Sequence, residues 1–309
     1  MEPSPEEIAE GYREFQGEGL ASWHFPMMND VVRNAAYETA LAAALKNAGK
    51  SGRVVLDIGT GSGLLAMMAA RHGATRVITC EELREVATKA QEIIKQNGFA
   101  DQIQVINKLS NQLVVGRDIP EKVDVLVTET FDYALLGEYA FATYRHAVRE
   151  LLKPDGQIIP ARARVFAMCI ESQEIFENHR VSQASGFDLS AFNELSGKIY
   201  TGYHLDKMKY RALSAPTEVF AFDFKNIPGD QALPREFAVT QSGVCHAVAF
   251  WFELQMDEKT TLTTAPHLKQ LSCWKQAVQL LEQPVQVNEG TALKLLAHHN
   301  SEEIWFTRS

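Results

Sequence analysis

The fold of this chain is decided by Val54-Val55-Leu56-Asp57-Ile58-Gly59-Thr60-Gly61-Ser62-Gly63-Leu64-Leu65. An apolar run leads into three alternating glycines and then into an apolar helical pattern, which predicts a buried strand, a tight turn and a helix. Glycines let a ligand approach the backbone, where a Cβ would block it. The dinucleotide fingerprint G-x-G-x-x-G needs a glycine where Leu64 stands. The acid two residues before the first glycine suits a cationic amino-acid ligand better than a diphosphate.

The pattern Asp57-x-Gly59-x-Gly61-x-Gly63 resembles motif I of the class I methyltransferases that use S-adenosyl-L-methionine. The resemblance implies this methyl donor as the cofactor, with Asp57, Gly59 and Gly61 in its binding site. A site for another nucleotide, or a turn with only a structural role, is the alternative.

The composition predicts a globular, soluble protein of 309 residues, with 46% hydrophobic and 22% charged residues. A net charge of -9 argues against a general nucleic-acid binder and is compatible with a cationic protein substrate. No stretch approaches the length of a transmembrane helix, and the acidic start lacks a signal segment. The four cysteines are scattered, which predicts no metal or disulfide framework and a reducing compartment. We expect a cytoplasmic protein, with the nucleus also possible in a eukaryote.

The first fifty residues are predicted to form N-terminal helices that cover the cofactor site. One helix is expected over Glu6–Phe15, interrupted by two glycines and by the segment Trp23–Pro26. A second helix runs through Asn34–Asn47, with Asn29 or Asp30 as its cap.

Residues 51–160 alternate between strand and helix patterns. Strands are predicted at 54–58, 76–80, 102–106 and 123–128, and helices at 63–72, 82–97 and 139–152. This alternation predicts an α/β fold, a Rossmann-like doubly wound parallel sheet that binds its ligand at the carboxyl ends of the strands. Asp57, Glu81 and Glu129 all fall at such ends.

The pattern changes after Pro160, where apolar or alternating runs continue without long helices between them. Strands are predicted at 165–171, 218–224, 236–240, 247–256 and 292–297, which indicates a mainly antiparallel sheet or β-barrel over residues 161–309. Residues 182–212 are polar and irregular, and they form either an arm that leaves this domain or an ordinary surface loop.

Three carboxylates have the placement that chemistry at this sheet edge requires. Glu81 ends the second strand, where a carboxylate can accept both hydroxyls of an adenosine ribose; Glu82 beside it is the alternative residue. Glu129 and Glu138 bracket the loop after the fourth strand. Two carboxylates can hold a guanidinium through its fork of donors and draw its charge away from the attacking nitrogen. Deprotonation before attack is implausible, because the pKa of free guanidinium lies above about 12.

Over nearly its whole length the chain resembles the protein arginine methyltransferases. Met27-Met28-Asn29-Asp30-Val31-Val32-Arg33 matches a helix motif of that family, and residues 128–138 match its double-glutamate loop. The resemblance implies that Glu129 and Glu138 are catalytic. It also implies a set of cofactor-binding residues: His24, Met27, Arg33, Asp57, Gly59, Gly61, Glu81, Ser110 and Asn111.

The same resemblance implies a substrate and an assembly. The substrate would be arginine in a basic or glycine- and arginine-rich protein, and the 182–212 segment would be the arm of a homodimer. Details such as Phe131-Asp132 and Trp23-His24 are similar to the monomethylating (type III) and symmetric-dimethylating (type II) branches. A non-catalytic cofactor-binding scaffold, or a methyltransferase for a small molecule, is the alternative.

The chain departs from the family pattern at Cys273, where the family's T-H-W loop has a histidine paired with an acid. A cysteine is not an equivalent basic partner, so activity is weakened, moved to another substrate, or supported by a histidine such as His246 or His267. Trp274 follows; we expect it to contact substrate, with core packing as the alternative.

Overall fold

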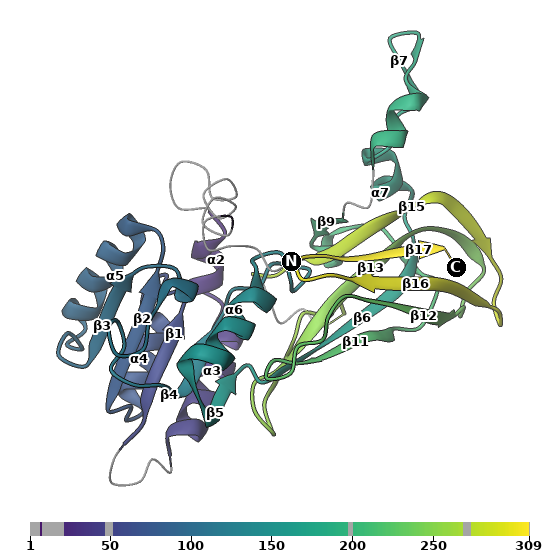
Figure 1. Cartoon of the computed structure of the whole chain (residues 1–309). Helices are drawn as coiled ribbons and strands as arrows, with labels where there is room; N and C mark the ends of the chain where they lie inside the picture. Colours follow the sequence, from purple (N-terminus) through teal and green to yellow (C-terminus); the bar gives the residue numbers. More distant parts are fainter. Residues whose placement is uncertain (1–6, 8–21, 47–51, 197–199, 268–272, 309) are drawn as a thin grey trace.

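The computed structural model describes residues 7, 22–46, 52–196, 200–267 and 273–308. A parallel sheet with its helices lies beside a larger antiparallel part, and a narrow arm projects from the latter (Figure 1). The α/β fold predicted from the sequence is confirmed. The chain passes from one part to the other at Ile159–Pro160, and we propose the division into 51–160 and 161–309 on this ground.

The parallel sheet has the strand order β3-β2-β1-β4-β5. Its strands are β1 (Val54–Ile58), β2 (Arg76–Glu81), β3 (Ile103–Asn107), β4 (Val123–Thr128) and β5 (Leu152–Ile159). The direction in which successive strands are added reverses between β1 and β4, which places a ligand crevice at the carboxyl ends of these two strands. Strand β5 was not predicted, because Pro154-Asp155-Gly156 has the composition of a turn; β5 pairs with β4 mainly through Gln157–Ile159.

Helices flank this sheet. They are α3 (Val31–Leu45), α4 (Leu64–Arg71), α5 (Arg84–Gln96) and α6 (Ala140–His146), the last extended by a π-turn at Ala147–Leu151. Asp30 caps α3 by accepting from the backbone N–H groups of Val32 (3.1 Å) and Arg33 (3.0 Å), so Asp30 and not Asn29 is the cap.

The prediction of an interruption at Trp23–Pro26 is wrong, because α2 (His24–Met28) is helical there. Pro26 falls in the first turn, where a missing N–H costs no intrahelical hydrogen bond. The expected helix at 6–15 lies outside the described residues apart from Glu7.

The antiparallel part contains a seven-stranded and a three-stranded sheet. The larger comprises β6 (Arg162–Glu171), β9 (Tyr200–Tyr203), β10 (Arg211–Ala212), β11 (Thr217–Asp223), β13 (Gly243–Gln255), β14 (Thr261–Thr263) and β15 (Gln276–Val287); the smaller comprises β12 (Gln231–Ala238), β16 (Ala292–His299) and β17 (Ile304–Arg308). Strands β9, β10, β14, β15 and β17 were not predicted. Buried Gln276 and Gln279 break the apolar pattern of β15, and Gln279 joins the sheets by bonding both the N–H (2.7 Å) and the C=O (2.9 Å) of Phe306.

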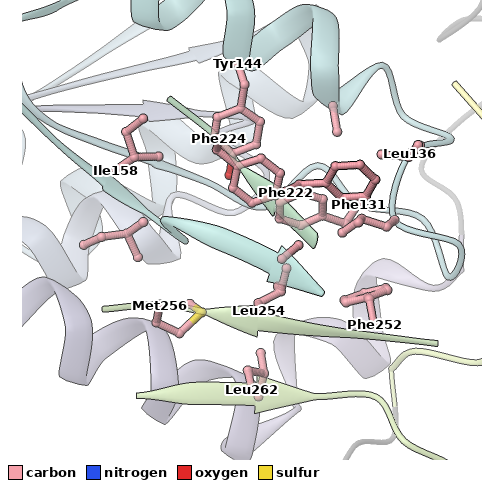
Figure 2. Packing of buried hydrophobic residues seen from close by; sticks show 14 of the residues in the cluster. Phe131, Leu136, Tyr144, Ile158, Phe222, Phe224, Phe252, Leu254, Met256 and Leu262 are labelled. Carbon is pink, nitrogen blue, oxygen red and sulfur yellow. The ribbon is translucent and has the colours of Figure 1, made fainter. Parts of the chain in front are cut away.

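Aromatic side chains pack the two parts together (Figure 2). Tyr144 of α6 stacks on Phe224 with ring centroids 4.2 Å apart, and Phe131 lies 5.8 Å from the same ring. Burying each such ring contributes roughly 1.5–3 kcal/mol. Phe131 belongs to the loop between Glu129 and Glu138, so this packing also fixes one side of that loop.

The arm contains α7 (Gln173–Asn178), β7 (Gln183–Ala184), β8 (Phe187–Asp188) and the 3-10 helix η3 (Ser190–Ser196), and it stands away from the rest of the chain (Figure 1). It was predicted to reach residue 212. Residues 200–203 and 211–212 instead pair with β15 and β6, because extended backbone at a sheet edge satisfies its polar groups by pairing. None of the described helices is long and apolar enough to cross a membrane.

Candidate active site

A pocket of about 650 Å³ lies at the carboxyl ends of β1, β2 and β4. Of the residues proposed from the sequence, those that line it are His24, Met27, Gly59, Gly61, Glu81, Ser110, Glu129, Glu138 and Trp274. Arg33, Asp57 and Asn111 do not line it within the described part of the chain. The pocket therefore brings together the glycine turn and both glutamates of the 129–138 loop.

The glycine turn and Glu81 form one end of this pocket. Gly59 and Gly61 have φ values of 83° and 50°, and a Cβ on Gly61 would meet nothing within 4 Å. The N–H of Gly61 donates to Glu81 Oε2 (3.1 Å) and that of Leu83 to Oε1 (3.1 Å). Burial raises the pKa of Glu81, and these backbone donors oppose the rise. The open space beside Gly61 leaves room for a ligand to approach the backbone, and the Glu81 carboxylate is placed to accept hydrogen bonds from ribose hydroxyls. Both features fit S-adenosylmethionine.

Asp57 supports the glycine turn from beneath. It is fully buried, its Oδ2 accepts from Thr79 Oγ1 (2.8 Å), and Thr79 Oγ1 lies 2.7 Å from Thr60 Oγ1. Its Oδ1 is buried without a hydrogen-bond partner. Burial raises the pKa of Asp57 to about 8, while the Thr79 hydrogen bond opposes the rise. The geometry gives Asp57 a place under the turn rather than on the pocket wall.

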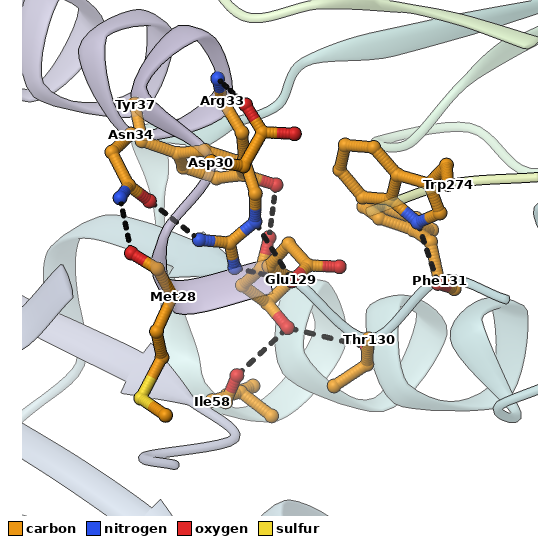
Figure 3. Close-up of polar contacts among 11 residues, drawn as sticks. Met28, Asp30, Arg33, Asn34, Tyr37, Ile58, Glu129, Thr130, Phe131 and Trp274 are labelled. Carbon is orange, nitrogen blue, oxygen red and sulfur yellow. Dashed lines mark hydrogen bonds and ion pairs between the residues drawn. The ribbon is translucent and has the colours of Figure 1, made fainter. Parts of the chain in front are cut away.

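Arg33 and Glu129 form a buried ion pair (Figure 3). Their side chains are 4% and 5% exposed, and Glu129 Oε2 accepts from Arg33 Nε (3.1 Å) and Nη2. Arg33 Nη1 also donates to Asn34 Oδ1 (2.8 Å), and the guanidinium lies 5.4 Å from the centroid of the Tyr37 ring. Burial raises the pKa of Glu129, and Arg33 opposes this rise. The pair fixes one carboxylate of the loop against α3.

Glu138 supplies the second carboxylate of the pocket. Burial, followed by the charges of Glu129 and Asp132, raises the pKa of Glu138 to about 8. Burial also raises the pKa of Asp132 to about 6, although the backbone N–H groups of Gly137 and Ala134 oppose it. The carboxylates of Glu129, Asp132 and Glu138 repel one another when ionised. The pocket therefore favours a bound cation, which would stabilise their ionised forms.

Trp274 and Cys273 close the side of the pocket nearest the antiparallel part. Trp274 is 6% exposed, donates from Nε1 to the C=O of Phe131 (3.2 Å), and packs edge-on against Phe252. It is thus a core residue whose ring also borders the pocket. Burial and the neighbouring Asp30 carboxylate raise the pKa of the Cys273 thiol.

Neither histidine considered as a replacement for the family's histidine borders the pocket. His246 lies at the base of the arm, where its Nδ1 accepts from the N–H of Ser172 (3.1 Å). His267 is exposed on a turn. Neither His246 nor His267 therefore takes the place of the family's histidine beside Cys273.

Comparisons with known proteins identify the family. Residues 161–307 match the arginine methyltransferase oligomerization subdomain, and residues 38–160 match the ribosomal protein L11 methyltransferase (PrmA) model. The chain is 39% identical over 290 residues to an arginine N(omega)-methyltransferase of Streptomyces achromogenes subsp. streptozoticus, covering 93% of this chain and 78% of that protein. This chain belongs to the protein arginine methyltransferase family. It is an arginine methyltransferase that uses S-adenosylmethionine.

Other members of the arginine methyltransferase family agree in sequence and fold. Protein arginine N-methyltransferase 7 of Drosophila ananassae is 33% identical over 322 residues, and the match covers 91% of this chain but 46% of that protein. Arabidopsis thaliana protein arginine methyltransferase 10 has the same fold, with a TM-score of 0.72 and 24% identity over 91% of this chain and 96% of that one. A Trypanosoma brucei PRMT1 enzyme-prozyme complex gives a TM-score of 0.79 at 24% identity, covering 92% and 90%.

Several residues of this methyltransferase pocket were not predicted from the sequence. They are Tyr133, Tyr200, Lys275, Glu302 and Glu303, and they come from the loop, from β9 and from the turns beside β15 and β17. No local motif marks them, because only the packing of the antiparallel part against the sheet brings them to the pocket. Among the described residues, no group of three His, Cys, Asp or Glu side chains could hold a metal ion.

Proposed function

We propose that this enzyme methylates the guanidinium of an arginine within a protein, with monomethylarginine or symmetric dimethylarginine as product. The observation that supports this proposal is the single pocket in which Glu129 and Glu138 lie with Gly61 and Glu81. One end suits a nucleoside and amino-acid ligand, and the other suits a planar cation. Strands β6–β17 and the arm provide a surface far larger than a small substrate requires.

In the proposed mechanism the side chains bind and polarise rather than deprotonate. His24, Met27, Gly59, Gly61 and Glu81 would hold S-adenosylmethionine, which supplies an electrophilic methyl group on a sulfonium. Glu129 and Glu138 would each accept hydrogen bonds from the guanidinium and concentrate its positive charge on the bound nitrogens. The lone pair of the remaining nitrogen would then be freer to attack the methyl carbon, and preorganised charge replaces a strong base. The N–C bond would form as the methyl–sulfur bond breaks, with its electron pair left on sulfur, and the methylated guanidinium would release one proton to water. The Arg33 pair keeps Glu129 oriented for this contact.

Mass spectrometry of a glycine- and arginine-rich protein incubated with S-adenosylmethionine tests the proposal. We expect a gain of one methyl mass on arginine for the wild type, the same gain for Glu121→Gln at an exposed position, and none for Glu129→Gln. Calorimetry should show that Glu129→Gln still binds the methyl donor. A second methyl group would be assigned as symmetric or asymmetric by fragmentation. An equal gain in Glu129→Gln contradicts the mechanism, and donor binding with no gain in the wild type supports a non-catalytic scaffold.

Free arginine is a second candidate substrate. The Streptomyces relative is named for arginine and not for a protein, and the exposed Lys275 at the same pocket could pair with an α-carboxylate. Incubation with free arginine, followed by amino-acid analysis, separates the candidates. Methylarginine formed from the free amino acid, together with loss of that product in Lys275→Ala, would favour this substrate over the protein.

We also propose that the enzyme is a homodimer joined through its arm. The arm exposes Phe187, Leu189, Phe192 and Leu195, and a second exposed apolar group, Trp23, Phe25 and Val31, lies at α2 and α3. Apolar side chains on a projecting element favour contact with another protein surface. Light scattering should give a dimer for the wild type and for Val114→Ser, which is exposed elsewhere, but a monomer for Phe192→Ser/Leu195→Ser. A monomeric wild type would overturn this proposal.

The cytoplasmic location remains a proposal. Its support is that Cys80, Cys169, Cys245 and Cys273 are free thiols in the fold, as a reducing compartment permits. Fractionation of cells that express a tagged chain would check it.

A further inference from the structure

Asp132 stabilises the loop between Glu129 and Glu138 by accepting hydrogen bonds from the backbone of the same loop. Its Oδ1 accepts from the backbone N–H groups of Ala134 (3.0 Å) and Gly137 (3.0 Å), and its C=O accepts from the N–H of Leu135 (3.1 Å). A Cβ on Gly137 would lie 2.5 Å from Asp132 Oδ2, so this glycine leaves the room that the carboxylate occupies. One side chain thus fixes both halves of the loop.

The backbone of this loop needs such support. Leu135 and Tyr139 have φ values of 84° and 54°, which residues with a Cβ seldom adopt. Conformations of this kind persist where the surrounding structure holds them. Tyr139 follows Glu138 directly, so the direction in which the Glu138 carboxylate points depends on this part of the backbone.

Strand β9 holds Asp132 from outside the loop. The hydroxyl of Tyr200 donates to Asp132 Oδ2 (3.2 Å). The ring of Tyr133 lies edge-on to that of Tyr200 (5.8 Å, 89°), and a Cβ on Gly202 would meet the Tyr133 ring at 3.0 Å. Tyr200 and Gly202 share one face of β9 because side chains alternate along a strand. The loop is therefore fastened to β9 at two points.

We infer that Tyr200 is a positioning residue for methyl transfer: through Asp132 it holds the 129–138 loop in the geometry that presents both glutamates to the guanidinium. The inference rests on the proposed function for the role of Glu129 and Glu138, while the contacts that carry it stand independently. Because β9 lies in the chain just beyond the arm and pairs with β15, Tyr200 also links the base of the arm to this loop.

The charge of Asp132 gives this role a pH dependence. The titratable groups facing Asp132 are Tyr133 and Glu138 from its own loop and Tyr200 from β9. Glu129, Lys275 before β15 and Glu303 before β17 border the same pocket. The Tyr200 hydrogen bond lowers the pKa of Asp132, which burial has raised to about 6. Without that hydroxyl a proton binds more readily, and a protonated carboxyl accepts weaker hydrogen bonds from the loop. The defect of Tyr200→Phe should therefore grow as the pH falls.

Hydrogen exchange of the full-length protein provides the structural test. The matched control is Tyr203→Phe on the same strand, whose hydroxyl lies 3.2 Å from His179 Nδ1 and not beside the loop. At pH 7 the amides of Ala134 and Gly137 should exchange at least about fivefold faster in Tyr200→Phe than in the wild type. In Tyr203→Phe their exchange rates should equal those of the wild type. Equal exchange in all three proteins overturns the inference.

Kinetics provide the functional test. The kcat of Tyr200→Phe should fall about tenfold at pH 6.5 and by less at pH 8, with the KM for S-adenosylmethionine unchanged. A loss of the same size at both pH values would indicate simple packing damage and overturn the inference. Absence of methyl transfer in the wild type would instead remove the proposed function, while the exchange experiment would still decide the loop contact.

Discussion

Replacing Glu138 by glutamine should stabilise the protein and abolish its activity. Burial raises the pKa of Glu138 from 4.5 to about 8. Between these pH values the Glu138 carboxyl is ionised in the unfolded chain but protonated in the folded one. Unfolding therefore releases a proton, and the free energy of unfolding falls as the pH rises from 4.5 to about 8. Glutamine carries no proton to lose, so Glu138→Gln removes this contribution.

The size of the effect follows from the pKa shift. One pKa unit corresponds to about 1.4 kcal/mol, so the full shift represents on the order of 5 kcal/mol above pH 8. Because the carboxylate faces an open pocket, water lowers this figure, and we expect Glu138→Gln to gain roughly 2–5 kcal/mol over the wild type at pH 8.5. Asp57 and Asp132 also have raised pKa values, but they are present in both proteins and cancel in the difference.

Urea unfolding from pH 5 to pH 9 measures this difference. The gap between Glu138→Gln and the wild type should widen as the pH rises, and the exposed Glu258→Gln should follow the wild type throughout. Methyl transfer by Glu138→Gln should be lost at every pH, because one of the two carboxylates that hold the guanidinium is gone. A gap that stays constant across this range would refute the burial argument for Glu138.

Three further substitutions test other parts of the site. Gly61→Ala and its control Gly98→Ala both place a side chain at positive φ with nothing within 4 Å, so each should cost about 1–2 kcal/mol of stability, but only Gly61→Ala should weaken donor binding in calorimetry. Trp274→Phe loses the hydrogen bond to the Phe131 C=O and should lower the free energy of unfolding by about 1 kcal/mol or more in urea titrations. Asp30→Ala removes the α3 cap and should cost about 1 kcal/mol in the same assay.

The sequence by itself determined four of the five strands of the parallel sheet, and its ligand edge. The run Val54–Ile58, the glycines after it and the alternation to residue 152 are local patterns, since buried strands, tight turns and helices each have a periodicity or composition of their own. The acids at strand ends follow from the same patterns. Glu81 and Glu129 could therefore be assigned to one pocket before any packing was known, whereas Glu138 was assigned through the resemblance of its loop to the family's double-glutamate loop.

Only the tertiary structure decided what those residues contact. Arg33 and Glu129 are 96 residues apart, and Tyr200 and Asp132 are 68 apart, so no periodicity relates them. Strand β15 was hidden because Gln276 and Gln279 are buried, with hydrogen-bond partners supplied by Thr264 and Phe306 from distant segments of the chain. A buried polar side chain is tolerated where distant groups satisfy it. Sequence patterns report which face of an element is apolar, whereas these contacts depend on which elements meet.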